Sequence, residues 1–318
     1  MTRDQQKTRA PDSFDAITAD LVAVLVAVTD GQPKIMTIAD AGALPSGPFQ
    51  FAHRSLQAGL RSWVEAQTGH PLGYAEQLYT FADRGRTGDA RAPHRISISY
   101  LGLTREDQAG KASSAHWSGW YEYFPWEDHR AAPPALIARI VAPRLRAWAK
   151  SATNGPIQKR RWQRAAITFG LDGRNWNEEL VLQRYELLYE TSMIPEAVRD
   201  KGGTEAAVPG RPMIADHRRI LATGIARLRA KIKYRPVVFE LMPPEFTLLQ
   251  LQRSVEALAG RAVHKQNFRR LIEQQELVEE TGAIAADTVG RPAKLFRFRH
   301  GVLAERAVVG TKLPLSRS

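Results

Sequence analysis

Residues 264–272 read His264-Lys265-Gln266-Asn267-Phe268-Arg269-Arg270-Leu271-Ile272. At helical spacing the apolar members Phe268, Leu271 and Ile272 share one face. The other positions carry Lys, Gln, Asn and Arg, side chains suited to base edges and phosphates. The segment therefore predicts a helix that buries one face and presents a polar, basic face to a partner.

The flanking sequence completes a helix-turn-helix with a wing. Thr247 is a good N-cap for an upstream helix, and Ala259-Gly260 ends it. The apolar positions of that helix recur at helical spacing: Leu248, Leu251, Val255 and Leu258. Downstream, we expect two extended runs around Gly282, then a turn at 290–292 and an alternating strand over 294–299. This order of elements is typical of a winged helix-turn-helix, which places its second helix in a DNA groove.

The basic side chains lie on the two elements that would touch DNA, which favours DNA binding over an ordinary helical subdomain with a solvated surface. We therefore predict that a double-stranded DNA operator is the partner. The predicted DNA-binding residues are Lys265, Gln266, Asn267, Arg269, Arg270, Arg291 and Lys294.

Composition supports a polyanionic partner. The chain has 318 residues, enough for two domains, and a formal net charge of +12. It contains no cysteine, which excludes disulfides, thiol catalysis and cysteine-ligated zinc fingers. No apolar run approaches the ~20 residues of a membrane span, and residues 1–11 lack the apolar core of an export signal. We expect a cytoplasmic protein without a membrane partner.

A second basic region lies in the middle of the chain. Between His129 and Leu171 there is no acidic residue, while nine basic ones accumulate: Arg130, Arg139, Arg144, Arg146, Lys150, Lys159, Arg160, Arg161 and Arg164. A solvated surface, contact with the DNA backbone and contact with the phosphates of a nucleotide are all compatible with this run. The solvated surface is the simplest of the three.

The N-terminal part alternates strands and helices. Strands are predicted at 21–28, which reads as a buried central strand, and at 34–38, 74–81 and 95–101. Helices are predicted at 55–67, 135–149 and 178–189, with an irregular basic stretch between the last two. Residues 105–130 read as a loop-rich insert crowded with aromatics, which are more often core than stacking platforms.

A further helix is predicted over 213–232. Its apolar positions form a heptad-like stripe: Ile214, Leu221, Ile225, Leu228 and Ile232. We expect this helix to join the two domains and to present its stripe to a second subunit, as in a homodimer.

Strand, hairpin, glycine loop, helix and strand follow one another as in a Nudix domain, an α/β/α sandwich built around a pyrophosphate site. The segment that resembles the Nudix box runs from Gly47 to Gly69, where the family carries several glutamates that hold Mg²⁺. Here Arg61 and Glu65 remain, but His53, Ser62 and Ala66 stand where carboxylates belong. The resemblance therefore implies a binding domain with no catalytic residue and no metal site.

Taken together, the chain resembles the Nudix-related transcriptional regulators of NAD metabolism, the NrtR group and its NadQ relatives. The segments that carry the resemblance are 74–81 with Arg84 and Arg86, 216–222 (Asp-His-Arg-Arg-Ile-Leu-Ala), 241–248 (Leu-Met-Pro-Pro-Glu-Phe-Thr-Leu) and 290–294. It implies a dimeric repressor of NAD biosynthesis or salvage genes. The implied effector is an adenine nucleotide (ADP-ribose, NAD or ATP), and no cofactor is required. The aromatic and basic insert over 107–164 departs from the family.

We predict an α/β (α+β) protein: a degenerate Nudix-like α/β/α sandwich followed by a C-terminal winged helix-turn-helix. The expected domains are a tail over 1–12, the sensing domain over 13–205, a linking helix region over 206–235, the winged helix over 236–310 and a tail over 311–318. The predicted ligand-binding residues are Arg61, Glu65, Tyr79, Phe81, Arg84 and Arg86. We interpret His217 as a structural histidine.

Two other functions fit the same residues. One is an active Nudix pyrophosphohydrolase with a DNA-binding module, which would use Glu65 and Glu76 with ligands from elsewhere. The other is an architectural DNA binder without an effector, whose Nudix-like half only dimerises.

Overall fold

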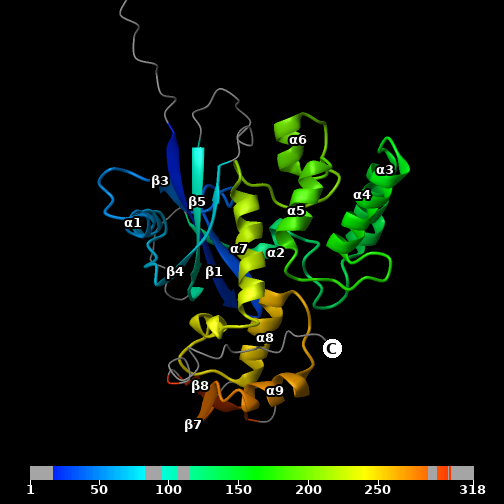
Figure 1. Cartoon of the computed structure of the whole chain (residues 1–318). Helices are drawn as coiled ribbons and strands as arrows, with labels where there is room; N and C mark the ends of the chain where they lie inside the picture. Colours follow the sequence, from blue (N-terminus) through cyan, green and yellow to red (C-terminus); the bar gives the residue numbers. More distant parts are fainter. Residues whose placement is uncertain (1–16, 83–94, 107–114, 286–291, 300, 302–318) are drawn as a thin grey trace, which may run out of the picture.

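The computed structural model describes residues 17–82, 95–106, 115–285, 292–299 and 301 (Figure 1). Six strands of the described residues form one mixed sheet: β1 (Thr18–Thr29), β2 (Gln32–Thr37), β3 (Ser46–Pro48), β4 (Tyr74–Phe81), β5 (Arg95–Leu103) and β6 (His116–Gly119). Their order is β4-β5-β1-β2-β6, with β3 paired to β1. β1 and β5 run parallel and the other pairs antiparallel. The predicted central strand is confirmed as β1.

Side chains alternate along β1 and so build two separate cores. Leu21, Ala23 and Leu25 face α1 (Leu56–Thr68), which packs through Leu60 and Val64. Val22, Val24 and Val26 face the opposite way, toward α7 (His217–Lys231). At Gly224 of α7 an added Cβ would lie 2.9 Å from Val24 Cγ1, so the missing side chain lets the helix approach the sheet closely. Figure 1 shows α1 and α7 on either side of the sheet, which confirms the sandwich.

The prediction that the α7 stripe faces a second subunit is wrong. Leu221, Ile225, Leu228 and Ile232 are at most 1 % exposed, because the sheet, α5 (Val181–Glu190) and α8 (Leu248–Ala259) cover them. Ile214 is exposed but precedes the helix. The stripe therefore joins the domains within one chain and is not available to a second subunit.

The aromatic segment is more regular than expected. Residues 116–119 form β6, which pairs with β2 at the edge of the main sheet, and α2 (Trp120–Tyr123) follows directly. Trp120, Tyr123, Phe124 and Trp126 are fully buried in the core on the α7 side of the sheet. The expectation that the aromatics are core is confirmed, whereas the loop-rich insert is in part an integral strand.

The basic stretch between the predicted helices is also regular, which corrects the prediction of irregular structure. After the π-helical turn η2 (Ile137–Val141) and α3 (Ala142–Lys150), residues Gly155–Phe169 form α4. Asn154 caps α4 by accepting from the Ile157 amide, and Gly170 ends it in the left-handed conformation. Its buried face carries Ala165, Ala166 and Phe169. α3 and α4 form a hairpin that stands to the side of the sheet, beyond α5 and α6 (Pro195–Lys201) (Figure 1).

The C-terminal domain has the predicted winged helix architecture. A short 3-10 helix, η3 (Val237–Leu241), leads into α8 and α9 (Lys265–Gln274). A capping box formed by Thr247 and Gln250 starts α8. Residues around Gly282 form one bulged strand, β7 (Val278–Ile284), and not two runs; it pairs with β8 (Lys294–Phe298).

A buried ionic triad holds the two parts of the chain together. The Glu127 carboxylate is 1 % exposed and accepts from two arginines that are fully buried. Arg184 of α5 donates from Nε to Oε1 at 2.5 Å, and Arg229 of α7 donates to Oε2 at 2.5 Å. Burial would raise the pKa of Glu127, but the two guanidinium groups outweigh it and hold that pKa below its ordinary value.

The triad is tied to the end of α8. Arg229 Nε donates to Leu258 O at 2.9 Å, and the Tyr121 hydroxyl donates to Ala257 O at 2.7 Å. His129 N donates to Gly260 O at 2.7 Å. Gly260 has φ +72, and an added Cβ would lie 2.5 Å from Glu127 O. The turn between α8 and α9 is therefore fixed against residues 121–129 and α7.

No helix in the described ranges has the length and apolar character needed to cross a membrane.

Glu127→Gln tests the triad. The substitution keeps the shape but leaves two buried guanidinium groups without their carboxylate, so we expect a loss of about 3–5 kcal/mol in the free energy of unfolding. Glu190→Gln is the matched control, because Glu190 pairs with Arg164 on the surface, where such a pair contributes about 0–1 kcal/mol. Denaturant unfolding measures both. Equal losses in the two variants would show that the triad does not hold the domains.

Candidate nucleic-acid interface and nucleotide site

The predicted DNA-reading residues of α9 share one solvent-facing surface. All five are exposed, whereas Phe268 and Ile272 on the opposite face are fully buried. The exposed set is Lys265, Gln266, Asn267, Arg269 and Arg270. The helix thus offers cations and amides from one side, the combination that reads base edges and holds phosphates.

The turn before α9 is held by side chains of α8. Glu256 Oε1 accepts from Val263 N at 2.8 Å and from Gln252 Nε2 at 3.0 Å. Gln252 Nε2 also donates to Val263 O at 3.1 Å. Both polar groups of Val263 are therefore bound, and the start of α9 is oriented relative to α8. The helical pattern of α8 alone did not reveal this role for Gln252 and Glu256.

The cations of the wing are paired within the wing itself. Lys294 contacts Glu280 at 2.9 Å, and Arg297 contacts Glu279 at 2.6 Å. The base of the wing is fixed by backbone hydrogen bonds in both directions between Phe246 and Phe296. Arg291 lies outside the described residues.

On the Nudix-like domain, Arg61 is engaged by the backbone. Its guanidinium donates to Leu72 O and, at 3.0 Å, to Gly73 O, so it clamps the loop between α1 and β4. Glu65, one turn further along α1, is exposed. The two remaining residues of the Nudix-like box thus lie on one helix, with Arg61 already committed to a structural contact.

The carboxylates of the hydrolase alternative do not meet. Glu76 pairs with Arg227 at 3.2 Å and with Lys231, both on α7. α7 and α1 cover opposite faces of the sheet, so Glu76 and Glu65 lie on different sides. Among the described residues no cluster of three or more His, Asp or Glu side chains is arranged to hold a metal ion.

Tyr79 and Phe81 form an aromatic pair at the end of β4, with ring centroids 5.0 Å apart. A bulge in β4 is filled by Ser99, whose hydroxyl donates to Tyr79 O at 2.8 Å. Tyr79 is 60 % exposed, whereas Phe81 is buried beneath the guanidinium of Arg219, 4.7 Å away. The adjoining cavity holds only about 30 Å³. Arg84 and Arg86 lie outside the described residues.

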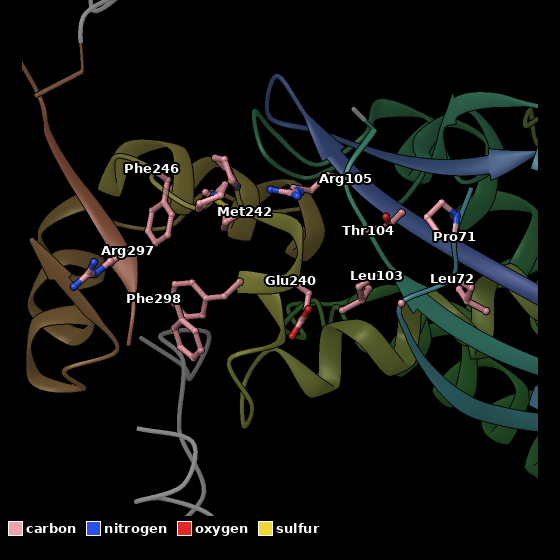
Figure 2. A pocket seen from close by; sticks show the side chains of 14 residues that line it. Pro71, Leu72, Leu103, Thr104, Arg105, Glu240, Met242, Phe246, Arg297 and Phe298 are labelled. Atoms are coloured by element: carbon pink, nitrogen blue, oxygen red, sulfur yellow. The ribbon is translucent and has the colours of Figure 1, made fainter. Parts of the chain in front are cut away.

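A larger cleft of about 630 Å³ separates the sheet from the winged helix (Figure 2). On the sheet side it is lined by Leu72, Leu103 and Thr104, and on the other side by Met242, Phe246 and Phe298, among others. Figure 2 shows the Arg105 side chain reaching across toward Met242. Because Arg61 clamps residues 72 and 73, the Nudix-like helix is mechanically linked to the wall of this cleft. No local sequence pattern indicates the cleft, because the residues of its two walls are far apart in the chain.

His217 has a structural environment, as predicted. Its Nδ1 accepts from Leu44 N at 3.0 Å, and the side chain is buried at the start of α7. Burial, with the charge of Arg95 second, lowers the pKa of His217 to about 4. The imidazole is therefore neutral at pH 7 and serves as an acceptor for the loop after β2.

Comparison with known proteins finds relatives of the C-terminal domain. Residues 238–298 match the family model of the NrtR DNA-binding winged helix domain. A curated relative, the ADPR responsive transcriptional repressor NtrR of Acinetobacter baylyi, is 41 % identical over 85 residues. That match covers 26 % of this chain, and the chain spans only about a third, 33 %, of the relative.

Solved structures share the fold of the whole chain. NrtR of Shewanella oneidensis, crystallised with a 27mer DNA, superposes with a TM-score of 0.53 at 20 % identity, covering 90 % of this chain and 95 % of that one. A MutT/nudix family protein from Enterococcus faecalis gives a TM-score of 0.50 at 13 % identity, with 92 % and 90 % covered. The fold is thus a Nudix-like domain followed by a winged helix.

The buried histidine predicts a pH dependence of stability. The pKa of His217 is about 4 in the folded chain and near 6.5 when unfolded, so between these values the unfolded chain binds more protons. Its contribution is present above about pH 6.5 and is lost as the pH falls toward 4, in total about 3 kcal/mol. Denaturant unfolding from pH 7 to 4 measures this, and His217→Gln should flatten the slope. An unchanged slope in the variant would refute the assignment.

Proposed function

We propose that this chain is a DNA-binding transcriptional repressor that responds to ADP-ribose. Its residues 238–298 match the NrtR winged helix family, and its fold is that of NrtR-type, Nudix-related proteins. The observation that carries the proposal is the exposed polar face of α9, set in a winged helix domain of the matching family. Its target genes would belong to NAD biosynthesis or salvage.

Operator binding would use α9 in the major groove and the wing on the backbone. Lys265, Gln266, Asn267, Arg269 and Arg270 are the residues proposed for α9, and Arg291 and Lys294 for the wing. As a homodimer the protein would meet two half-sites about one helical turn, or a multiple of it, apart. Because the α7 stripe is buried, the proposed dimer must use another surface of the chain.

The effector would bind to the Nudix-like domain. ADP-ribose is proposed because the relative from Acinetobacter baylyi is named as ADPR responsive; NAD and ATP share its adenine nucleotide and are the alternatives. Tyr79 offers an exposed ring for stacking next to Phe81. Arg61 and Glu65 lie on α1, at the opposite face of the sheet from Phe81, so they would form a separate contact region for the ligand. Arg84 and Arg86, which lie outside the described residues, are proposed to contact its phosphates. A ligand that engages Arg61 would compete with Leu72 and Gly73, and so would disturb the wall of the cleft facing the winged helix.

We propose that the domain binds without cleaving. Ser62 and Ala66 stand where the Nudix box carries carboxylates, and Glu76 is paired with α7 on the other side of the sheet from Glu65. A single carboxylate does not supply the ligand set that Mg²⁺ needs to stabilise charge on a leaving phosphate.

The first test concerns α9. On a duplex selected by the wild-type protein from a random library, Arg269→Ala or Arg270→Ala should weaken binding by roughly 1–3 kcal/mol and relax base preference. Lys294→Ala should weaken binding to all sequences by a similar factor. Arg253→Ala, an exposed arginine of α8, is the control. If neither α9 variant changes affinity or preference, α9 is not the reading helix.

The second test concerns the effector. Saturating ADP-ribose should change operator affinity roughly 5- to 150-fold, and by linkage operator DNA should change ADP-ribose affinity by the same factor. Incubation with Mg²⁺ should leave the nucleotide intact. If ADP-ribose binds but operator affinity does not change, the protein is not a sensor of this nucleotide. Steady release of AMP that disappears in Glu65→Gln would instead establish a hydrolase.

A further inference from the structure

The net positive charge of this protein lies outside its winged helix domain. Residues 238–298 contain eight basic and eight acidic side chains, so their formal charges cancel. Residues 129–171 contain nine basic side chains and no acidic one, against a net charge of +12 for the whole chain. Duplex DNA is bound largely by neutralising phosphates with Lys and Arg. The winged helix therefore contributes no net charge, and the excess of positive charge lies elsewhere in the chain.

The helical hairpin of α3 and α4 displays this charge to solvent. Leu145 and Ala149 of α3 pack toward the buried face of α4, which leaves the basic side chains outside. The exposed cations are Arg139, Arg144, Arg146, Lys150, Lys159, Arg160 and Arg164. The amphipathic pattern thus builds a folded, cationic surface, whose apolar side faces its own partner helix.

Most of these cations have no acidic partner in the part of the chain that the structure describes. Arg146 contacts Asp172 at 3.5 Å and Arg164 contacts Glu190 at 2.6 Å. For the other five, no ion pair occurs among the described residues: Arg139, Arg144, Lys150, Lys159 and Arg160. In the wing, by contrast, Lys294 and Arg297 are already paired with glutamates. The hairpin therefore has more charge to offer a polyanion than the wing does.

The two helices also share a groove. It has a volume of about 350 Å³ and is lined by Arg146, Lys150, Gln158, Lys159 and Trp162, among others. The Arg146 guanidinium lies 4.4 Å from the Trp162 ring, which holds it in place. Cations and an amide on both walls suit phosphate oxygens, which accept from either group.

The chain that leads into the hairpin is bound to the turn before the reading helix. His129, at the start of the basic segment, donates from N to Gly260 O and forms a bridge with Arg261, in the turn that leads to α9. The His129 ring lies 3.8 Å from that of Trp176, just after the hairpin. The segments that precede and follow the hairpin in the chain therefore contact each other close to the turn before α9.

We propose that the α3–α4 hairpin contacts the sugar-phosphate backbone of the DNA that α9 reads, and supplies most of the sequence-independent affinity. This inference rests on the proposed DNA-binding function. In this arrangement α9 distinguishes base sequences, and the hairpin neutralises phosphates beside the recognition site. Duplex DNA is the occupant that the row of exposed cations favours, because DNA presents a series of phosphates and a free nucleotide presents one or two. A free nucleotide in the groove is an outcome that the test separates.

The test is the salt dependence of DNA binding by the full chain. The variant Lys150→Ala/Lys159→Ala/Arg160→Ala removes three exposed cations that make no ion pair with the described residues. The control Arg54→Ala/Arg211→Ala/Arg227→Ala removes the same charge from other exposed sites. Each lost phosphate contact flattens the plot of log K against log salt by about 0.9, so the hairpin variant should lose roughly 2–3 in slope. Its affinity should fall about 10- to 100-fold near 0.15 M salt.

The probes are a mixed-sequence duplex of about 40 base pairs, roughly four helical turns, and a selected duplex of the same length. Both should lose affinity by the same factor in the hairpin variant and little in the control. An unchanged slope would overturn the proposal and leave a merely solvated surface. Loss of ADP-ribose binding with an unchanged slope would overturn it in favour of a nucleotide groove. Failure of the proposed function looks different: Arg269→Ala and Arg270→Ala would then leave sequence preference intact, whatever the hairpin variant does.

Discussion

The architecture depends on one buried carboxylate between two buried arginines. Glu127 receives Arg184 from α5 and Arg229 from α7, and Arg229 also donates to the last turn of α8. Taking three ionised groups out of water is costly, and the arrangement is tolerable only because nearly every donor has an acceptor. Backbone carbonyls at Thr168, Asn177 and Glu178 take the remaining guanidinium hydrogens. The placement of the turn before α9 follows from this satisfied network.

The same network explains why the domains share a core. α8 contacts β1, β2 and α7, and the hydrophobic cluster runs without interruption from Val24 in the sheet to Ile272 in α9. A signal from the Nudix-like domain therefore has two physical routes to the DNA-binding surface. One is α7 with Arg229 at its end. The other is the loop at Leu72 and Gly73, which Arg61 holds against the cleft below the wing.

Local patterns made the winged helix, β1 and α1 predictable, because alternation, helical spacing and caps such as Thr247, Gly69 and Gly260 act over a few residues. α4 was not predicted from the sequence, because its apolar face is short and most of its other positions are basic or polar. The α7 stripe was found, but spacing alone does not say whether the sheet or a second chain covers it. Glu127, Arg184 and Arg229 are 57 and 102 positions apart, so no local pattern shows that they meet. The predicted nucleotide-binding residues stay a prediction, and two of them, Arg84 and Arg86, lie outside the described ranges.

Gly260 has a consequence for engineering. Gly260 has a left-handed backbone and lies so close to Glu127 O that no Cβ fits there, so the end of α8 tolerates no other residue at this position. A DNA-binding domain excised at residue 236 would leave Leu251, Val255 and Leu258, now fully buried, without part of their cover. New sequence specificity is therefore better transplanted as a smaller cassette, from Arg261 through the wing, leaving α8 in place. The boundary at which a DNA-reading segment can be exchanged therefore lies between α8 and α9, inside the winged helix domain, and not at the start of that domain.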